Sequence, residues 1–224
     1  MSGATHTGRT NGKNGCRRIL GVDPAAAGPT GYGIIESDGR RCRMLHYGAL
    51  KVAGRQRECA GGALRDVYAL LCELIEDFAP DAIAVESVFT ALNMRTALRL
   101  AEVRGVVLLA AAQHGIEVHS YAPREVKASV AGHGHADKRQ MQIMVRALLS
   151  MTVTPEPPDA ADALAVALCH VQAEQARRRF GLPAKSDLVK ARFVAIAAGS
   201  SNGLASFRTG GTTRGGLPRI VSTR

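Results

Sequence analysis

Two short apolar stretches decide the fold of this chain: Ile19-Leu-Gly-Val-Asp23 and, after a loop of small residues, Thr30-Gly-Tyr-Gly-Ile-Ile-Glu36. The run from Arg18 to Asp23 has the length and composition of a buried strand, and so does Tyr32 to Glu36. The turn signal Asp38-Gly39 follows, and Arg43 to Lys51 predicts a third strand. Three successive strands with short connections predict an antiparallel meander.

The pattern changes to helical spacing after the meander. Apolar residues recur every three or four positions from Leu64 to Phe78, and Pro80 ends the predicted helix. The further expected elements are a strand over 82–86, a helix over 91–114, a strand over 116–121, a short helix over 123–130, a helix over 137–150 capped by Asp137, and a helix over 159–178. The order βββ-α-β-α-β-α-α predicts a mixed α/β sheet, with a meander on one side and parallel crossovers on the other.

Length and charge define the domain organisation that we expect. The chain has 224 residues, of which 46% are hydrophobic, which is sufficient for one globular domain. We place this domain at 18–179, between a disordered basic extension over 1–17 and a basic, mostly disordered tail over 180–224. The net charge is +10, and residues 175–224 carry ten basic residues and one acidic residue. Basic ends on a slightly acidic body favour contact with a polyanion, although solvated tails give the same pattern.

The composition also excludes several classes of protein. The longest apolar run, Val106 to Ala112, has seven residues, whereas a membrane span needs about 20. Residues 1–18 contain no apolar stretch that would read as a secretory signal. The five cysteines are scattered and form no C-x-x-C pair, which favours reduced thiols. We therefore expect a cytoplasmic protein without a membrane partner.

Four carboxylates are the strongest chemical signal. Asp23 and Glu86 each end an apolar strand, and Asp159 and Asp162 lie three residues apart at the start of the last helix, on one helix face. Four converging carboxylates would repel one another unless cations lay between them, and Mg²⁺ is the natural candidate. Two such ions about 3.5–4 Å apart would stabilise the attacking and leaving oxygens of phosphodiester hydrolysis.

Each of these acids also has a purely structural interpretation. Asp159 and Asp162 follow Pro157-Pro158, where acidic residues cap helices and favour the helix dipole. Asp23 precedes a proline and is an ordinary residue to open a turn. Glu86 is harder to explain structurally, because a charge beside a buried strand is costly without a partner. Composition and spacing alone leave a protein with an acidic site, of which a nuclease is one example.

The ordered set of motifs resembles the RuvC family, the bacterial Holliday junction resolvases. The resemblance extends from about Arg18 to His170 and covers roughly two-thirds of the chain. The motifs are Ile19-Leu-Gly-Val-Asp-Pro24, Thr30-Gly-Tyr-Gly-Ile-Ile-Glu36, Ala84-Val-Glu-Ser-Val-Phe89, Arg104-Gly-Val106, Tyr121 with Val126-Lys127, Gly132-His-Gly134, Lys138-Arg-Gln140 and Asp159-Ala-Ala-Asp-Ala-Leu-Ala165.

The resemblance implies a fold, an activity and partners. The fold is expected to be ribonuclease H-like, with a mixed five-stranded sheet flanked by helices. Asp23, Glu86, Asp159 and Asp162 would be the metal-binding acids, holding Mg²⁺, with two ions expected per active site and Mn²⁺ as a substitute. A homodimer would cut two opposing strands of a four-way DNA junction symmetrically and would work with the RuvA–RuvB branch-migration complex. The long helix over 91–114 is the expected dimer element, because it has more apolar positions than one core face needs. These positions are Leu98, Ala101, Val103, Val106, Leu109 and Ala110. The alternative is that all of them belong to the core of one chain.

Five residues are candidates for contact with DNA. Lys127 and Lys138 match family lysines near the scissile DNA and would bind phosphate or offset charge in the transition state. Phe89 matches an aromatic residue that could stack on an unpaired base; the structural alternative is a buried Phe after a strand. Arg95 and Arg139 suit a phosphate-facing surface, and Arg95 suits a solvated helix face equally well. His133 and His135 are interpreted as loop residues and not as metal ligands.

The sequence departs from the family after the first acid. Ala25 stands where the family has Gly, and the loop to Thr30 is one residue longer. This departure keeps open a junction-binding protein without catalysis. A ribonuclease H-like nuclease acting on another nucleic acid is a further alternative. A sugar-kinase-like ATPase would need phosphate-binding Gly loops late in the chain, and Gly210-Gly211 and Gly215-Gly216 are too isolated to provide them.

Overall fold

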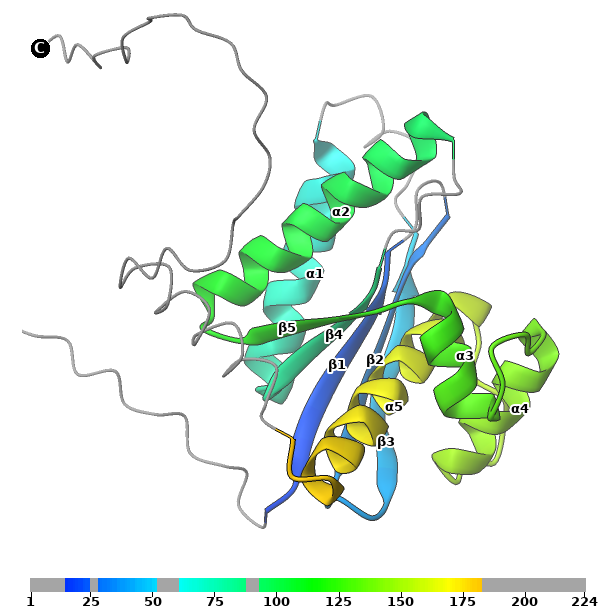
Figure 1. Ribbon diagram of the computed structural model, residues 1–224. Coiled ribbons are helices and arrows are strands. Elements are labelled where there is room, and N and C mark those ends of the chain that lie inside the picture. The colour runs from blue at the N-terminus through cyan, green and yellow to red at the C-terminus, as the bar shows by residue number, and fades with distance from the viewer. Residues whose placement is uncertain (1–14, 25–27, 52–60, 88–92, 183–224) are drawn as a thin grey trace, which may run out of the picture. The chain divides into compact units, whose positions relative to one another are not determined.

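A five-stranded sheet in the order β3-β2-β1-β4-β5 forms the centre of the computed structural model (Figure 1). The structure describes residues 15–24, 28–51, 61–87 and 93–182. The strands are β1 Arg17–Asp23, β2 Thr30–Ser37, β3 Cys42–Leu50, β4 Ala82–Glu86 and β5 Glu117–Tyr121. The helices are α1 Gly62–Phe78, α2 Met94–Gln113, α3 Pro123–Ala131, α4 Lys138–Leu148 and α5 Pro158–Arg179.

The sheet has the mixed topology that the sequence predicts. Strand β1 pairs antiparallel with β2, where Gly21 lies opposite Gly33, and β2 pairs antiparallel with β3. On its other side β1 pairs parallel with β4, and β4 pairs parallel with β5. The meander therefore occupies one half of the sheet and the parallel crossovers the other, as expected for a ribonuclease H-like fold.

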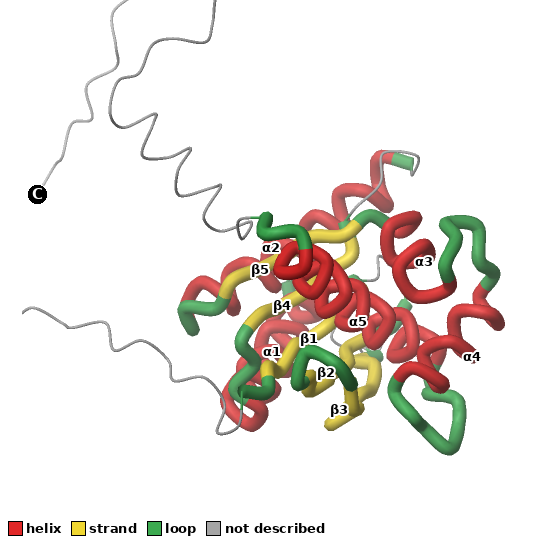
Figure 2. The backbone as a smooth tube through the Cα atoms, turned by 60° about the horizontal axis from the view of Figure 1, so that its bottom comes forward, coloured by secondary structure: helices red, strands yellow, loops and turns green. Residues whose placement is uncertain are grey.

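Helices cover both faces of the sheet (Figure 2). Leu20 and Val22 of β1 point to the face covered by α1 and α2, where they join Leu71 and Val107 in one core cluster. Ile19 points to the opposite face, where α3, α4 and α5 provide a second cluster. The alternation along β1 follows from the two-residue period of a strand, so one strand contributes to both cores.

Glycines on the sheet allow α5 to approach it closely. A Cβ atom on Gly31 would lie 2.0 Å from the carbonyl oxygen of Asp159, and one on Gly21 would lie 2.0 Å from that of Ala163. Real side chains cannot be accommodated at that separation, so the helix fits only because both residues lack one. Helix α5 is correspondingly rich in alanine, and every residue from Ala160 to Val171 except Asp162 is buried. The glycines thus place the start of α5 directly over the end of β1 and the start of β2.

Most predicted boundaries agree with the structure to within two residues. Asp137 accepts a hydrogen bond from the Gln140 backbone N–H and caps α4 as expected. The short helix expected over 123–130 is present as α3. Three helices therefore follow β5, one more than the order βββ-α-β-α-β-α-α counts. Helix α2 begins at Met94 behind Asn93, which caps it; the expected start at Ala91 lies outside the described residues. The helix considered over Leu188 to Ile196 and the ends at 1–14 and 183–224 also lie outside them.

None of the described helices is long and apolar enough to cross a membrane.

Candidate active site

Asp23 and Glu86 lie together because their strands are neighbours. The last paired residues of β1 and β4 are Val22 and Val85, which lie side by side in parallel register. The next residue on each strand is the acid, so both carboxylates are at the carboxyl edge of the sheet. This edge is where open α/β sheets place their ligands, and the expected convergence of Asp23 and Glu86 is observed.

The start of α5 brings the other two acids to the same edge. Asp159 lies in the first helical turn, and Asp162 follows one turn later. The N-cap residue of α5 is Pro157, and no side chain makes a capping hydrogen bond there. Neither acid therefore caps the helix with its side chain, although Asp159 in the first turn is favourably placed for the helix dipole. Their position is set instead by Gly31, which lets the helix backbone at Asp159 approach β2.

A cavity of about 240 Å³ opens between these elements. Three acids line it, Asp23, Glu86 and Asp162, together with both predicted lysines, Lys127 of α3 and Lys138 of α4. Asp159 does not line the cavity, although its charge acts on Asp23. Pro123, Val126, Met141 and Ala165 form the apolar part of the wall. The cavity thus combines a carboxylate cluster with two cations in a partly apolar site.

Burial and charge repulsion raise the pKa values of Asp23 and Glu86. Burial, followed by repulsion from Glu86, Asp162 and Asp159, raises the pKa of Asp23 to about 8 in spite of nearby Lys138. Burial and repulsion from Asp162 raise the pKa of Glu86 to about 7, against the opposing effect of Lys127. The site therefore holds more negative charge than it can stabilise unaided, and either protons or cations must compensate.

The lysines compensate part of this charge. Lys138 Nζ lies 3.2 Å from Oδ2 of Asp162, and the lysine side chain is 57% exposed. Lys127 is half-buried and acts on Glu86 electrostatically. Both ammonium groups lie at the border between the acids and solvent, where a phosphate group would approach.

The donor set fits a hard cation by its chemistry. Carboxylate oxygens are the ligands that Mg²⁺ prefers, and the raised pKa values of Asp23 and Glu86 are the electrostatic response to uncompensated charge. Within the described ranges, no three acidic, histidine or cysteine side chains converge closely enough to form a preformed metal site.

The other predicted site residues lie outside the cavity. Arg95 near the start of α2 and Arg139 of α4 are exposed, and neither lines it. Phe89 and Ala25 lie outside the described residues. His133 and His135 are exposed in the turn after α3, which confirms their interpretation as loop residues.

Sequence reasoning missed the apolar wall of the cavity and its support. Met141 lies one turn after Lys138 on α4, and this spacing would have identified it. Tyr121 is directly opposite Glu86 in the β4–β5 register, and its hydroxyl makes a 2.8 Å hydrogen bond with Nδ1 of His170 on α5. This contact joins the end of β5 to the helix that carries Asp159 and Asp162. His170, which is fully buried, had no signal in the sequence that distinguished it from a core residue.

Comparison with known proteins agrees with this geometry. The family model described as "Crossover junction endodeoxyribonuclease RuvC" matches residues 19–170. The RuvC protein of Chloroflexus aggregans is 46% identical over 165 residues, which are 74% of this chain and 99% of the relative. The RuvC protein of Alkaliphilus metalliredigens is 43% identical over 152 residues, covering 68% of this chain and 91% of the relative.

Solved structures give the same result. The structure of Thermus thermophilus RuvC in complex with Holliday junction substrate matches with a TM-score of 0.65 and 34% identity, covering 71% of this chain and 95% of the other. The yeast mitochondrial Holliday junction resolvase Ydc2 matches with a TM-score of 0.53 at 15% identity, over 73% of this chain and 82% of that one, and this supports the fold alone. On the strength of the family match and these relatives, the chain belongs to the RuvC family of crossover junction endodeoxyribonucleases.

Proposed function

We propose that this chain resolves four-way (Holliday) DNA junctions by paired, symmetric nicks during recombination and DNA repair. The observation that carries the proposal is the cavity in which Asp23, Glu86 and Asp162 face Lys127 and Lys138. The relative of known structure at 34% identity holds a Holliday junction substrate. Acids of this kind beside cations are suited to phosphodiester hydrolysis, in which charge develops on the phosphate oxygens.

The proposed cofactor is Mg²⁺, with two ions per active site and Mn²⁺ as a substitute. Asp23, Glu86, Asp159 and Asp162 would hold it. The raised pKa values of Asp23 and Glu86, and the repulsion that Asp159 and Asp162 exert on Asp23, support this assignment. When bound, divalent cations activate water and stabilise the attacking and leaving oxygens. The carboxylates of this chain supply the hard oxygen donors, and Val126 and Met141 form part of the apolar wall beside them.

The lysines are proposed to handle the phosphate. Lys138 lies on the border of the cavity, paired with Asp162, so an incoming phosphate would compete with that carboxylate for the ammonium group. Lys127 approaches from α3 on the same wall. Arg95 and Arg139 are proposed as exposed contacts to the DNA backbone outside the cavity, and Phe89 as a stacking residue beside Glu86.

A homodimer is proposed because a junction with paired arms presents two equivalent phosphodiesters, and a two-fold dimer presents two equivalent sites. Helix α2 supports it with an exposed apolar face: Leu98 is 58% exposed and Leu109 is 52% exposed. Met94, Ala101 and Leu108 are exposed on the same helix. Val103 and Ala110 of the same helix are buried within the chain. The apolar positions of α2 therefore exceed what one core face needs.

Cooperation with the RuvA–RuvB branch-migration complex and a cytoplasmic location are also proposed. The family match supports the first. The cysteine usage supports the second, since the four cysteines in the described part of the chain form no disulfide. The domain limits remain a proposal as well: a nuclease domain over 18–179, between basic segments over 1–17 and 180–224.

A nicking assay tests the proposal. A synthetic four-way junction and a linear duplex of the same sequence are incubated with the purified chain, with Mg²⁺ or with a chelator. We expect paired, symmetric nicks on the junction alone and only with Mg²⁺, and their loss in Asp23→Asn and Glu86→Gln while junction binding persists. A folded dimer that binds junctions and never nicks them with Mg²⁺ or Mn²⁺ would establish the binding-protein alternative instead.

A further inference from the structure

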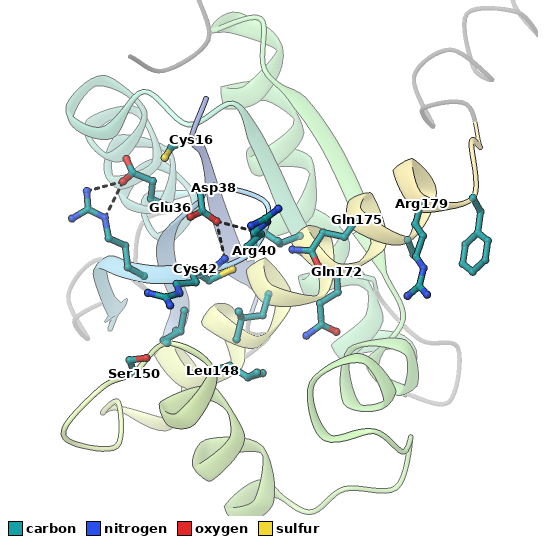
Figure 3. Close-up of a pocket in the computed structure, with 17 residues that line it drawn as sticks. Cys16, Glu36, Asp38, Arg40, Cys42, Leu148, Ser150, Gln172, Gln175 and Arg179 are labelled. Atoms are coloured by element: carbon teal, nitrogen blue, oxygen red, sulfur yellow. Dashed lines mark hydrogen bonds and ion pairs between the residues drawn. The ribbon is translucent and has the colours of Figure 1, made fainter. Parts of the chain in front are cut away.

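A second, larger cavity lies at the opposite end of the fold from the acids. Its volume is about 1050 Å³, and Figure 3 shows it between the first residues of β3, the end of α4 and the C-terminal half of α5. Residues near the start of β1 and the last turns of α5 line it, such as Cys16 and Arg179. Asp23 is at the other end of β1, about 20 Å away at the rise of a strand. No part of the active site reaches this cavity, which we call the distal groove.

The distal groove carries uncompensated positive charge. Arg40, Arg41, Arg43 and Arg179 line it, against two acids, Glu36 and Asp38. Glu36 is already engaged, because its carboxylate pairs with Arg43 at 2.6 Å and with Arg18 at 3.1 Å.

Asp38 leaves the neighbouring guanidinium groups available. Its carboxylate oxygen accepts the backbone N–H groups of Arg40 and Arg41, both at 2.7 Å, which fixes the turn before β3. Among the described residues, the side chains of Arg40, Arg41 and Arg179 make no ion pair with a carboxylate. These three arginines therefore line the groove without a close ion pair to a described carboxylate, although Asp38 attracts Arg40 and Arg41 electrostatically.

The floor of the distal groove is apolar. Leu149, Leu168 and Val171 are buried beneath it, whereas Phe180 at its rim is 71% exposed and Leu148 is 37% exposed. Gln172 and Gln175 of α5 add amide groups between the apolar and the basic parts (Figure 3). An occupant must therefore present carboxylates to the arginines and apolar side chains to the floor.

We propose that the distal groove binds an acidic, amphipathic peptide segment of a partner protein. Arginine pairs with carboxylates in two-pronged hydrogen bonds, and an exposed Phe beside buried aliphatic residues is a typical anchor point for a peptide side chain. A nucleic-acid backbone complements the arginines but leaves the apolar floor uncovered. The chain's own tail is unsuited by charge, because residues 183–224 contain seven basic residues and one acidic residue.

The test uses the full chain and short fluorescent peptides, with binding followed by anisotropy. The first peptide alternates Glu with Leu and Phe in an amphipathic pattern. The second keeps every Glu and replaces the apolar residues by Ser, and the third keeps the apolar residues and replaces Glu by Gln.

Two variants of the chain test the two parts of the groove. Arg40→Glu/Arg41→Glu reverses the charge of the basic rim, and Phe180→Ser removes the apolar anchor. All three residues are exposed, so folding is preserved. Arg65→Glu on α1 and Val153→Ser are the matched controls outside the groove, at side chains 72% and 63% exposed.

We expect the first peptide to bind about tenfold more tightly than the second or third, which corresponds to 1.4 kcal/mol. The rim variant and Phe180→Ser should each weaken it while both controls leave it unchanged. Equal binding of the first two peptides, or an equal loss with Arg65→Glu, would reduce the effect to net charge and overturn the proposal. It would also be overturned if the rim variant weakened a labelled duplex and left the first peptide unaffected, since the groove would then be a nucleic-acid surface.

Discussion

Lys138 Nζ lies 3.2 Å from Oδ2 of Asp162, and this ion pair joins the first residue of α4 to the second turn of α5. The pair is partly solvated, with 57% of the lysine and 30% of the aspartate side chain exposed, so it contributes little to stability. Its position at the border of the acidic cavity is more informative. In the proposed reaction the same ammonium group turns to the phosphate.

Replacing Lys138 separates this role from general attraction to DNA. We expect Lys138→Gln to lower the single-turnover nicking rate at saturating enzyme by about 10²-fold, because a positioned charge near the transition state is lost. Arg139→Gln removes the same charge from the neighbouring, exposed position outside the cavity. It should weaken junction affinity modestly and leave the saturated rate unchanged. Equal effects of the two variants on the nicking rate would show that Lys138 has no specific role in catalysis.

The carboxylates predict an unusual dependence of stability on pH in chelator. The folded-state pKa of Asp23 is raised to about 8 and that of Glu86 to about 7, so the folded chain binds more protons than the unfolded chain between about pH 4 and 8. Stability must then fall as pH rises through this window. Urea unfolding at intervals from pH 5 to 8.5 should show the decline, and Asp23→Asn should flatten it.

A further measurement with Mg²⁺ identifies the source of that decline. Mg²⁺ should restore stability most at pH 8, where the carboxylates are ionised and bind a cation best. Glu36 affects the pH dependence of stability in the opposite direction. Hydrogen bonds from Arg43 and Arg18 lower its pKa, although burial opposes them. The stability that Glu36 contributes is therefore lost only as the pH falls into the acid range. A flat profile for the unsubstituted chain between pH 5 and 8 would contradict the assigned charge cluster.

The sequence was sufficient for the sheet and for the convergence of Asp23 and Glu86, because each depends on local pattern. Asp23 and Glu86 follow apolar runs, and parallel strands necessarily bring their carboxyl ends to one edge. The sequence was not sufficient for contacts between segments that are distant in sequence, or for deciding which apolar face is buried. Nothing in the spacing of Val103 and Ala110 distinguishes a core position from a dimer surface on α2. The contact between Tyr121 and His170, and the groove at the far end of α5, depend on segments distant in sequence.

Substitution of Gly31 tests the link between fold and site. A Cβ atom there would meet the Asp159 carbonyl oxygen at 2.0 Å, so Gly31→Ala must displace the start of α5 together with Asp159. We expect a loss of about 1–3 kcal/mol in the free energy of unfolding, as for other overpacked sites, and a nicking rate lowered beyond what the unfolded fraction explains. Gly105→Ala is the control, because space is open around Gly105 in α2, and it should stabilise the helix by up to about 1 kcal/mol. Unchanged stability in Gly31→Ala would show that α5 is not held as closely as described.

The apolar face of α2 predicts the oligomeric state. Leu98→Glu and Leu109→Glu place charges on side chains that are more than half exposed in the single chain, so folding should survive. Sedimentation equilibrium should show a dimer for the unsubstituted chain and a monomer for the double variant. Val153→Glu, at a similarly exposed apolar residue off this helix, should remain dimeric. Dissociation of this control, or a double variant that stays dimeric, would place the interface elsewhere.

The basic tail predicts the salt dependence of DNA binding. Residues 183–224 contribute seven basic residues and one acidic residue, and each phosphate they neutralise adds about 0.9 to the slope of log affinity against log salt. Changing the seven basic residues to Gln keeps the chain length and should flatten that slope for a linear duplex, with lower affinity at low salt. The nicking rate at saturating enzyme should stay the same, since the acids and lysines of the cavity are untouched. An unchanged slope would mean that the tail does not contact the phosphate backbone, and the charge of the tail would then need another explanation.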